Sequence, residues 1–78
     1  MSVSRVEALA AARKLFRTLA SAPDPRQRAR AICAELVRAS DWTDTQRAAI
    51  DELVVWLQAY PPSAELRARC DRLLTSLR

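Results

Sequence analysis

The chain contains no glycine in 78 residues, and this absence limits the turns that it can form. Glycine normally supplies the positive φ angles of tight β-hairpin turns, and asparagine, the usual substitute, is also missing. The four prolines fall in two clusters between long segments with helical apolar periodicity. Half of the residues are hydrophobic and 28% are charged, which is typical of a globular chain. We therefore expect one folded domain over residues 1–78, built of helices alone.

Helix starts are predicted where a capping residue precedes an apolar stripe with a period of about 3.6 residues. The expected N-caps are Ser4, Asp24, Thr43 and Ser63. Two of them, Ser4 and Thr43, are followed three residues later by Glu or Gln, which is the spacing of a capping box. The predicted helices span residues 5–21, 25–39, 44–60 and 64–77.

Short connections between helices of similar length place consecutive helices antiparallel. The predicted fold class is therefore all-α, a single-domain four-helix bundle of two antiparallel αα-hairpins. We expect the buried stripes to be Val6, Leu9, Ala12, Phe16 and Leu19; Ala29, Ile32, Cys33 and Leu36; Ile50, Leu53, Trp56, Leu57 and Tyr60; and Leu66, Cys70, Leu73 and Leu77.

A weak internal repeat agrees with two hairpins. A shift of 37 residues superposes Pro25 on Pro62, and "RARAICAEL" on "LRARCDRLL", so that Cys33 meets Cys70. Periods of this length occur in helical-hairpin repeats, whose stacked units present a binding surface. Residues 60–74 resemble the closing helix of a tetratricopeptide-type repeat, but the aromatic and glycine positions of that family's first helix are missing. The resemblance implies helix pairing and no particular function.

The residue types that most catalytic sites require are missing. Without glycine, histidine or asparagine, the chain has no phosphate loop, no dinucleotide-binding turn, no histidine metal ligand and no His-based triad. The carboxylates fall at helical positions that diverge or that are spaced to pair with arginine, as Glu65 is with Arg69 at i+4. We expect no enzyme, no cofactor, no metal site and no small-molecule substrate.

The two cysteines, Cys33 and Cys70, are too few and too far apart for a metal knuckle. Both lie on predicted inward stripes, where a reduced thiol packs as a small hydrophobe. A redox-sensitive disulfide between the second and fourth helices is the alternative, and it requires those helices to be adjacent.

Nothing in the sequence predicts a membrane span or a secretory signal, because charges or prolines interrupt every apolar run. We therefore expect a soluble cytoplasmic protein with reduced thiols. Residues 1–22 are rich in Ser, Ala and Arg with a single acid, so an organellar transit peptide is the alternative interpretation of this segment.

Charge is distributed unevenly along the chain. Residues 1–38 hold eight basic and three acidic residues, whereas residues 39–78 hold five basic and six acidic residues. Arg26, Arg30 and Arg38 form a basic face on the second helix, which could contact nucleic acid phosphates. The bases lack exposed aromatic neighbours for stacking, and the acidic third helix is poorly suited to the major groove of DNA.

The third helix carries apolar residues on more than one side. Ala48, Val55 and Ala59 lie opposite the main apolar face, in a strip suited to a second copy of the chain or to a target helix. Trp42 precedes the Thr43 cap, where it could cover the core or serve as an interface anchor. A lone exposed valine among alanines is the alternative interpretation of the strip.

We therefore predict a small non-enzymatic protein-protein interaction module, acting as an adaptor, chaperone-like partner or inhibitor. Its partner is another protein or a second copy of itself. Twelve arginines to one lysine are typical of GC-rich bacterial or phage coding sequences. The first alternative is a nucleic-acid-associated regulator that uses the basic first hairpin. The second is an engineered helical bundle without a natural function, because regular caps and near-equal helices are design habits.

Overall fold

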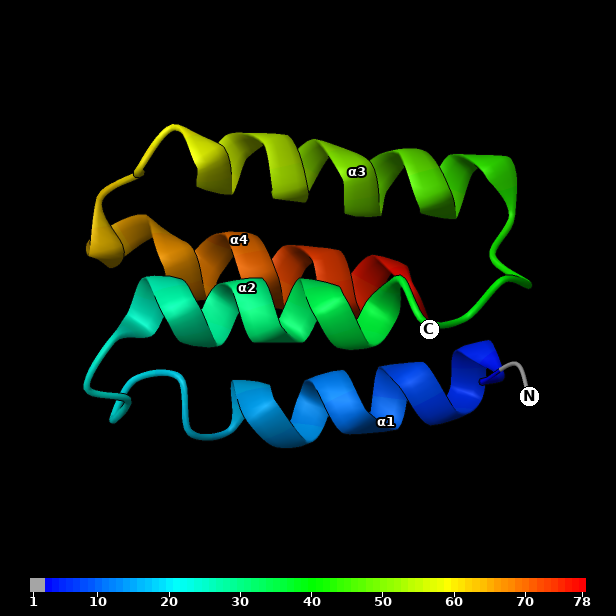
Figure 1. The fold of residues 1–78 in the computed structure, drawn as a ribbon, viewed down its shortest axis with the longest axis horizontal. Helices are drawn as coiled ribbons and strands as arrows, with labels where there is room; N and C mark the ends of the chain where they lie inside the picture. Colours follow the sequence, from blue (N-terminus) through cyan, green and yellow to red (C-terminus); the bar gives the residue numbers. More distant parts are fainter. Residues whose placement is uncertain (1–2) are drawn as a thin grey trace.

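The computed structural model describes residues 3–78 and is an all-α bundle, as predicted (Figure 1). Its four helices are α1 (Arg5–Phe16), α2 (Pro25–Leu36), α3 (Asp44–Gln58) and α4 (Ser63–Ser76). Consecutive helices run antiparallel, so α2 and α4 point the same way (Figure 1). The predicted pair of αα-hairpins is therefore confirmed.

The helices α2 and α4 form the inner pair of the bundle. Each of them packs against the other three helices, whereas α1 and α3 do not pack against each other in the described part of the chain. Figure 1 shows α1 and α3 along opposite edges, with α2 and α4 between them. The outer helices are thus covered on their inner sides only.

Side-chain caps fix three of the four helix starts. The N–H groups of Glu7 and Gln27 donate to Ser4 Oγ and Asp24 Oδ1, each at 3.2 Å. Thr43 and Gln46 form a complete capping box. The predicted cap Ser63 is wrong: α4 begins at Ser63 and its N-cap is Pro62, which makes no side-chain cap bond. Proline precedes the helix in the extended backbone conformation that an N-cap adopts, so no hydroxyl is needed to set this start.

The helices end earlier than predicted, and α1 differs most, ending at Phe16 instead of residue 21. After Phe16 the backbone tightens: the N–H groups of Thr18 and Leu19 donate to carbonyl oxygens three residues earlier, at 3.2 and 3.1 Å. Thr18 Oγ1 also donates to the Leu15 carbonyl oxygen at 3.1 Å. Such bonding competes with a further α-helical turn, which apolar periodicity alone does not reveal.

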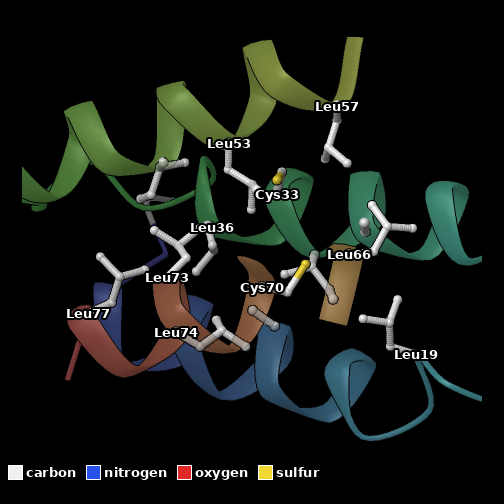
Figure 2. Packing of buried hydrophobic residues seen from close by; sticks show 14 residues of the cluster. Leu19, Cys33, Leu36, Leu53, Leu57, Leu66, Cys70, Leu73, Leu74 and Leu77 are labelled. Carbon is white, nitrogen blue, oxygen red and sulfur yellow. The ribbon is translucent and has the colours of Figure 1, made fainter. Parts of the chain in front are cut away.

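The core is a continuous cluster of buried aliphatic, alanine and cysteine side chains (Figure 2). Every residue of the stripes predicted for α2 and α4 is buried. Within residues 3–78 no buried side-chain nitrogen or oxygen lacks a hydrogen-bond partner. The inner pair is therefore held by apolar packing, with polar groups kept at the surface.

Two residues predicted to be buried are exposed. Val6 is 72% exposed, because α1 turns Ala8 and Ala12 toward the bundle, at 1% and 0% exposed, and these small side chains permit close approach to α2. Tyr60 is 76% exposed, because α3 ends at Gln58 and Tyr60 takes a φ of 51°, which removes it from the helical phase. The error at Tyr60 comes from extending the helical pattern past the end of α3, and the error at Val6 comes from placing the inward face of α1 away from Ala8.

A matched pair on α3 tests its orientation. Ile50 is 0% exposed and Val55 is 65% exposed. Shortening the buried residue, Ile50→Val, should lower the free energy of unfolding by about 0.5 to 1.5 kcal/mol. Val55→Ala should change it by about 0.5 kcal/mol or less. Urea denaturation of both variants measures the difference, and equal losses would show that α3 is rotated from the orientation described.

Candidate interaction surfaces

An apolar groove of about 470 Å³ lies between α2 and α3. Its lining residues are Arg30, Cys33, Ala34, Val37, Val54, Leu57, Gln58 and Tyr60. Of these lining residues, Arg30 is the one that carries a charge. Two large apolar side chains of the lining, Val37 and Tyr60, are exposed to solvent. The groove therefore offers hydrophobic surface that the bundle does not cover.

Tyr60 occupies a strained backbone position at one end of this groove. Its φ of 51° is the left-handed conformation in which many helices end, usually at glycine. For a residue with a Cβ this conformation costs about 1–2 kcal/mol. The side chain is largely exposed, so its own packing recovers little of that cost. Sequence reasoning missed Tyr60, although the following Pro61 indicates that a helix could not continue there.

The predicted strip on α3 lies on the solvent side of the bundle. Ala48, Val55 and Ala59 are all exposed. The helical step of about 100° per residue separates Val55 from Val54, which lines the α2/α3 groove. The strip is therefore a separate surface from the groove.

Trp42 lies half-buried at the other end of α3 from Ala59. Its indole Nε1 donates to the Leu36 carbonyl oxygen at 2.8 Å and so satisfies a carbonyl in the last turn of α2. The indole also packs against the core cluster. The structure thus gives Trp42 a place over the core and does not bring it together with the strip.

The three arginines predicted as a basic face differ in their surroundings. Arg26 Nε donates to the Pro61 carbonyl oxygen at 2.9 Å, and Arg38 Nη1 lies 3.2 Å from Glu35 Oε2. Arg30 lines the α2/α3 groove instead. Two of the three are therefore engaged within the protein, which weakens the case for a continuous phosphate-binding face on α2.

A second groove, of about 560 Å³, lies along α1 beside the C-terminal residues Leu77 and Arg78, and we call it the α1/α4 groove because these two residues directly follow α4. It is lined by Arg5, Val6, Leu9, Ala10, Arg13, Arg17, Gln46, Leu77 and Arg78. Arg5 is paired with Asp41, whose Oδ2 lies 3.9 Å from Arg5 Nε. Over residues 3–78, no acidic side chain lies within 4.0 Å of the guanidinium groups of Arg13 and Arg17. This groove therefore combines apolar surface with arginines that form no close ion pair, and Asp71 lines an adjoining hollow together with Arg13 and Arg17.

Cys33 and Cys70 are free thiols buried in the core of the inner helix pair, at 4% and 0% exposed (Figure 2). Burial raises the pKa of Cys33 from 9.0 to about 12, and the neighbouring Cys70 adds to this shift. Burial likewise raises the pKa of Cys70 to about 11. The adjacency of α2 and α4 that a disulfide requires is present, but protonated buried thiols are poor nucleophiles.

Neither a metal-binding cluster nor a membrane-spanning helix is found in the described residues. Residues 3–78 contain no group of three or more metal-ligating side chains. None of the helices in the same range has the length and apolar character to cross a membrane. Comparison of the chain with protein-family models, curated proteins and solved structures finds no significant match. A functional proposal therefore rests on the two grooves and the α3 strip described above.

The raised thiol pKa values predict a pH dependence of stability. Below pH 9 the thiols are protonated in both the folded and the unfolded chain, so their contribution to stability is fully present. Between pH 9 and about 12 the unfolded thiols ionise first, and that contribution is lost as pH rises. Denaturation at several pH values should show a steeper alkaline loss for the wild type than for a Cys33→Ala, Cys70→Ala double variant. Identical slopes would contradict the raised values.

Two substitutions of Tyr60 separate backbone strain from side-chain contacts. Tyr60→Gly removes the Cβ that opposes a φ of 51°, so the free energy of unfolding should rise by roughly 0.5 to 1 kcal/mol after the entropy of glycine in the unfolded chain is deducted. Tyr60→Ala keeps the Cβ and should bring no gain. Thermal unfolding of both variants measures this, and a glycine variant less stable than the alanine variant would exclude the strain.

Proposed function

We propose that this protein is a non-enzymatic binding module that holds an amphipathic helix of a partner protein in the α2/α3 groove. Small helical proteins of this kind act as adaptors, chaperone-like partners or inhibitors. Helix recognition in a hydrophobic groove needs apolar surface between two fixed helices and a few polar groups at the edge. The lining of the α2/α3 groove supports such a role.

Tyr60 is the observation that carries the proposal. An exposed aromatic residue at a strained position costs stability that glycine would spare. Strain of this kind tends to be retained where it places a side chain for function. Tyrosine is also enriched in binding hot spots because it offers large apolar area with one polar tip. Tyr60 therefore serves as the anchor that a partner helix contacts.

The charge at the groove defines the partner further. Arg30 is the charged residue in the lining, and it is exposed beside Ala34. A partner helix that places apolar side chains against Val37, Val54 and Leu57 would place a carboxylate near Arg30. We expect a partner helix with an apolar face and at least one acidic residue beside it.

Site-specific photocrosslinking tests the proposal. A photoreactive phenylalanine analogue at Tyr60 should crosslink one discrete partner in a lysate of the native host, and the same analogue at Val37 should capture the same protein. The matched control places the analogue at Ala68, which is exposed on α4 outside the groove.

A second substitution makes the result specific to the groove. Ala34→Glu places a carboxylate in the apolar lining and should reduce the Tyr60 crosslink at least about tenfold. Ala68→Glu makes the same change outside the groove and should leave the crosslink unchanged. Equal capture from positions 60 and 68, or a Tyr60 crosslink that survives Ala34→Glu, would contradict the α2/α3 groove as the binding site.

A further inference from the structure

The α1/α4 groove has the character of a binding site for an acidic helix. Its apolar surface comes mainly from Val6, Leu9 and Ala10 on α1, with Val6 72% exposed, while Leu77 in the lining is a core residue at 3% exposed. Arg13 and Arg17 lie along the same side of α1. An occupant that fits both features has a small apolar strip flanked by carboxylates.

The outer face of α3 has that complementary character. Its exposed strip of Ala48, Val55 and Ala59 is apolar, and small residues at two of the three positions permit close helix approach. Asp51 and Glu52 flank the strip on either side and are both exposed. Asp51 Oδ1 lies 3.2 Å from Arg47 Nε, while Glu52 makes no ion pair within the described chain. The same molecule thus carries both halves of a charge-complementary contact.

The two surfaces point in different directions. Figure 1 shows α1 and α3 along opposite edges of the bundle, separated by α2 and α4. One molecule can therefore offer its α3 face to a second copy while its α1/α4 groove receives a third. A contact between two different surfaces of one protein is heterologous, and it builds a ring or an open chain of molecules.

We propose that the protein self-associates head to tail, with the outer face of α3 of one copy held in the α1/α4 groove of the next. Val55 of one copy packs against Val6 and Leu9 of its neighbour, and the carboxylates of α3 face Arg13 and Arg17. This contact does not use the α2/α3 groove, so it goes beyond the binding role proposed above.

A second copy suits the α1/α4 groove better than a nucleic acid does. Phosphate binding needs positive charge but gains nothing from an aliphatic surface, and the lining holds no aromatic side chain on which a base could stack. The acidic face of α3 satisfies both the arginines and the apolar residues. The concentration of this α3 face also rises with the protein concentration, because every copy of the chain carries one.

Light scattering coupled to size exclusion tests the association. At low salt the apparent mass of the wild type should rise with protein concentration, and salt should reverse the rise because exposed charges are screened. Arg17→Glu disables the groove and Val55→Asp disables the α3 face. Each variant should associate at least about tenfold more weakly. Lys14→Glu makes the same charge change at an exposed α1 residue outside the groove lining and should weaken association much less.

Mixing the two disabled variants identifies the geometry. In a head-to-tail contact, Arg17→Glu keeps an intact α3 face and Val55→Asp keeps an intact groove. The mixture should therefore form a one-to-one dimer that neither variant forms alone. Circular dichroism of each variant confirms that its helices are retained.

Three results would overturn the proposal. The first is a wild type that stays monomeric at millimolar concentration and low salt. The second is a mixture that remains monomeric although each variant has lost association, because this would indicate a contact between identical surfaces. The third is binding of labelled duplex DNA or of an unrelated acidic helical peptide by a monomeric wild type, with loss of that binding in Arg17→Glu, since the groove would then serve a foreign ligand.

Discussion

Because α2 and α4 each contact all of the other helices, this inner pair fixes where the outer helices α1 and α3 lie. Among residues 3–78 the helices α2 and α4 contribute eight of the sixteen buried hydrophobic residues, including both cysteines at 4% and 0% exposed. The buried side chains of the inner pair include small ones such as Cys33, Cys70 and Ala29. Because the bundle has so few residues, the buried side chains of α2 and α4 supply much of the burial available to it.

An inner pair of helices leaves the outer pair only partly covered. The helices α1 and α3 do not pack on each other within the described residues, so each exposes a face, and grooves lie between α2 and α3 and along α1 beside the C-terminal residues. The 37-residue repeat relates α1 to α3 and α2 to α4, but the two grooves are not lined by equivalent positions. They differ in chemistry: one is apolar with Tyr60 at its end, and the other is lined by arginines.

Helix starts were predictable from the sequence because a cap is a local interaction between neighbouring residues. Asp24 and Thr43 make the predicted bonds, and even the error at Ser63 displaces the start of α4 by one residue. Helix ends were less predictable, because without glycine each end depends on local bonds such as those of Thr18. All residues predicted for the buried stripes of α2 and α4 are buried, since inner helices have neighbours on most sides, but Leu74 is buried as well and was not predicted.

The candidate surfaces were only partly predictable. Exposure of Ala48, Val55 and Ala59 agrees with the strip predicted on α3, whereas Val6 and Tyr60 were assigned to the core. Val6 is exposed because close packing of α1 on α2 favours alanine at the contact, and a helical wheel does not contain that information. The α2/α3 groove joins residues more than 15 positions apart, so its existence depends on tertiary packing that no local pattern reports.

Native-state hydrogen exchange tests the central role of the inner pair most directly. Amides in the middle of α2 and α4, around Ile32 and Cys70, should exchange only through global unfolding, because both residues are fully buried between other helices. Amides of α1 and of the outer face of α3 should open at a lower free energy. Slower exchange in α1 or α3 than in α2 and α4 would contradict a bundle built on the α2 and α4 contact.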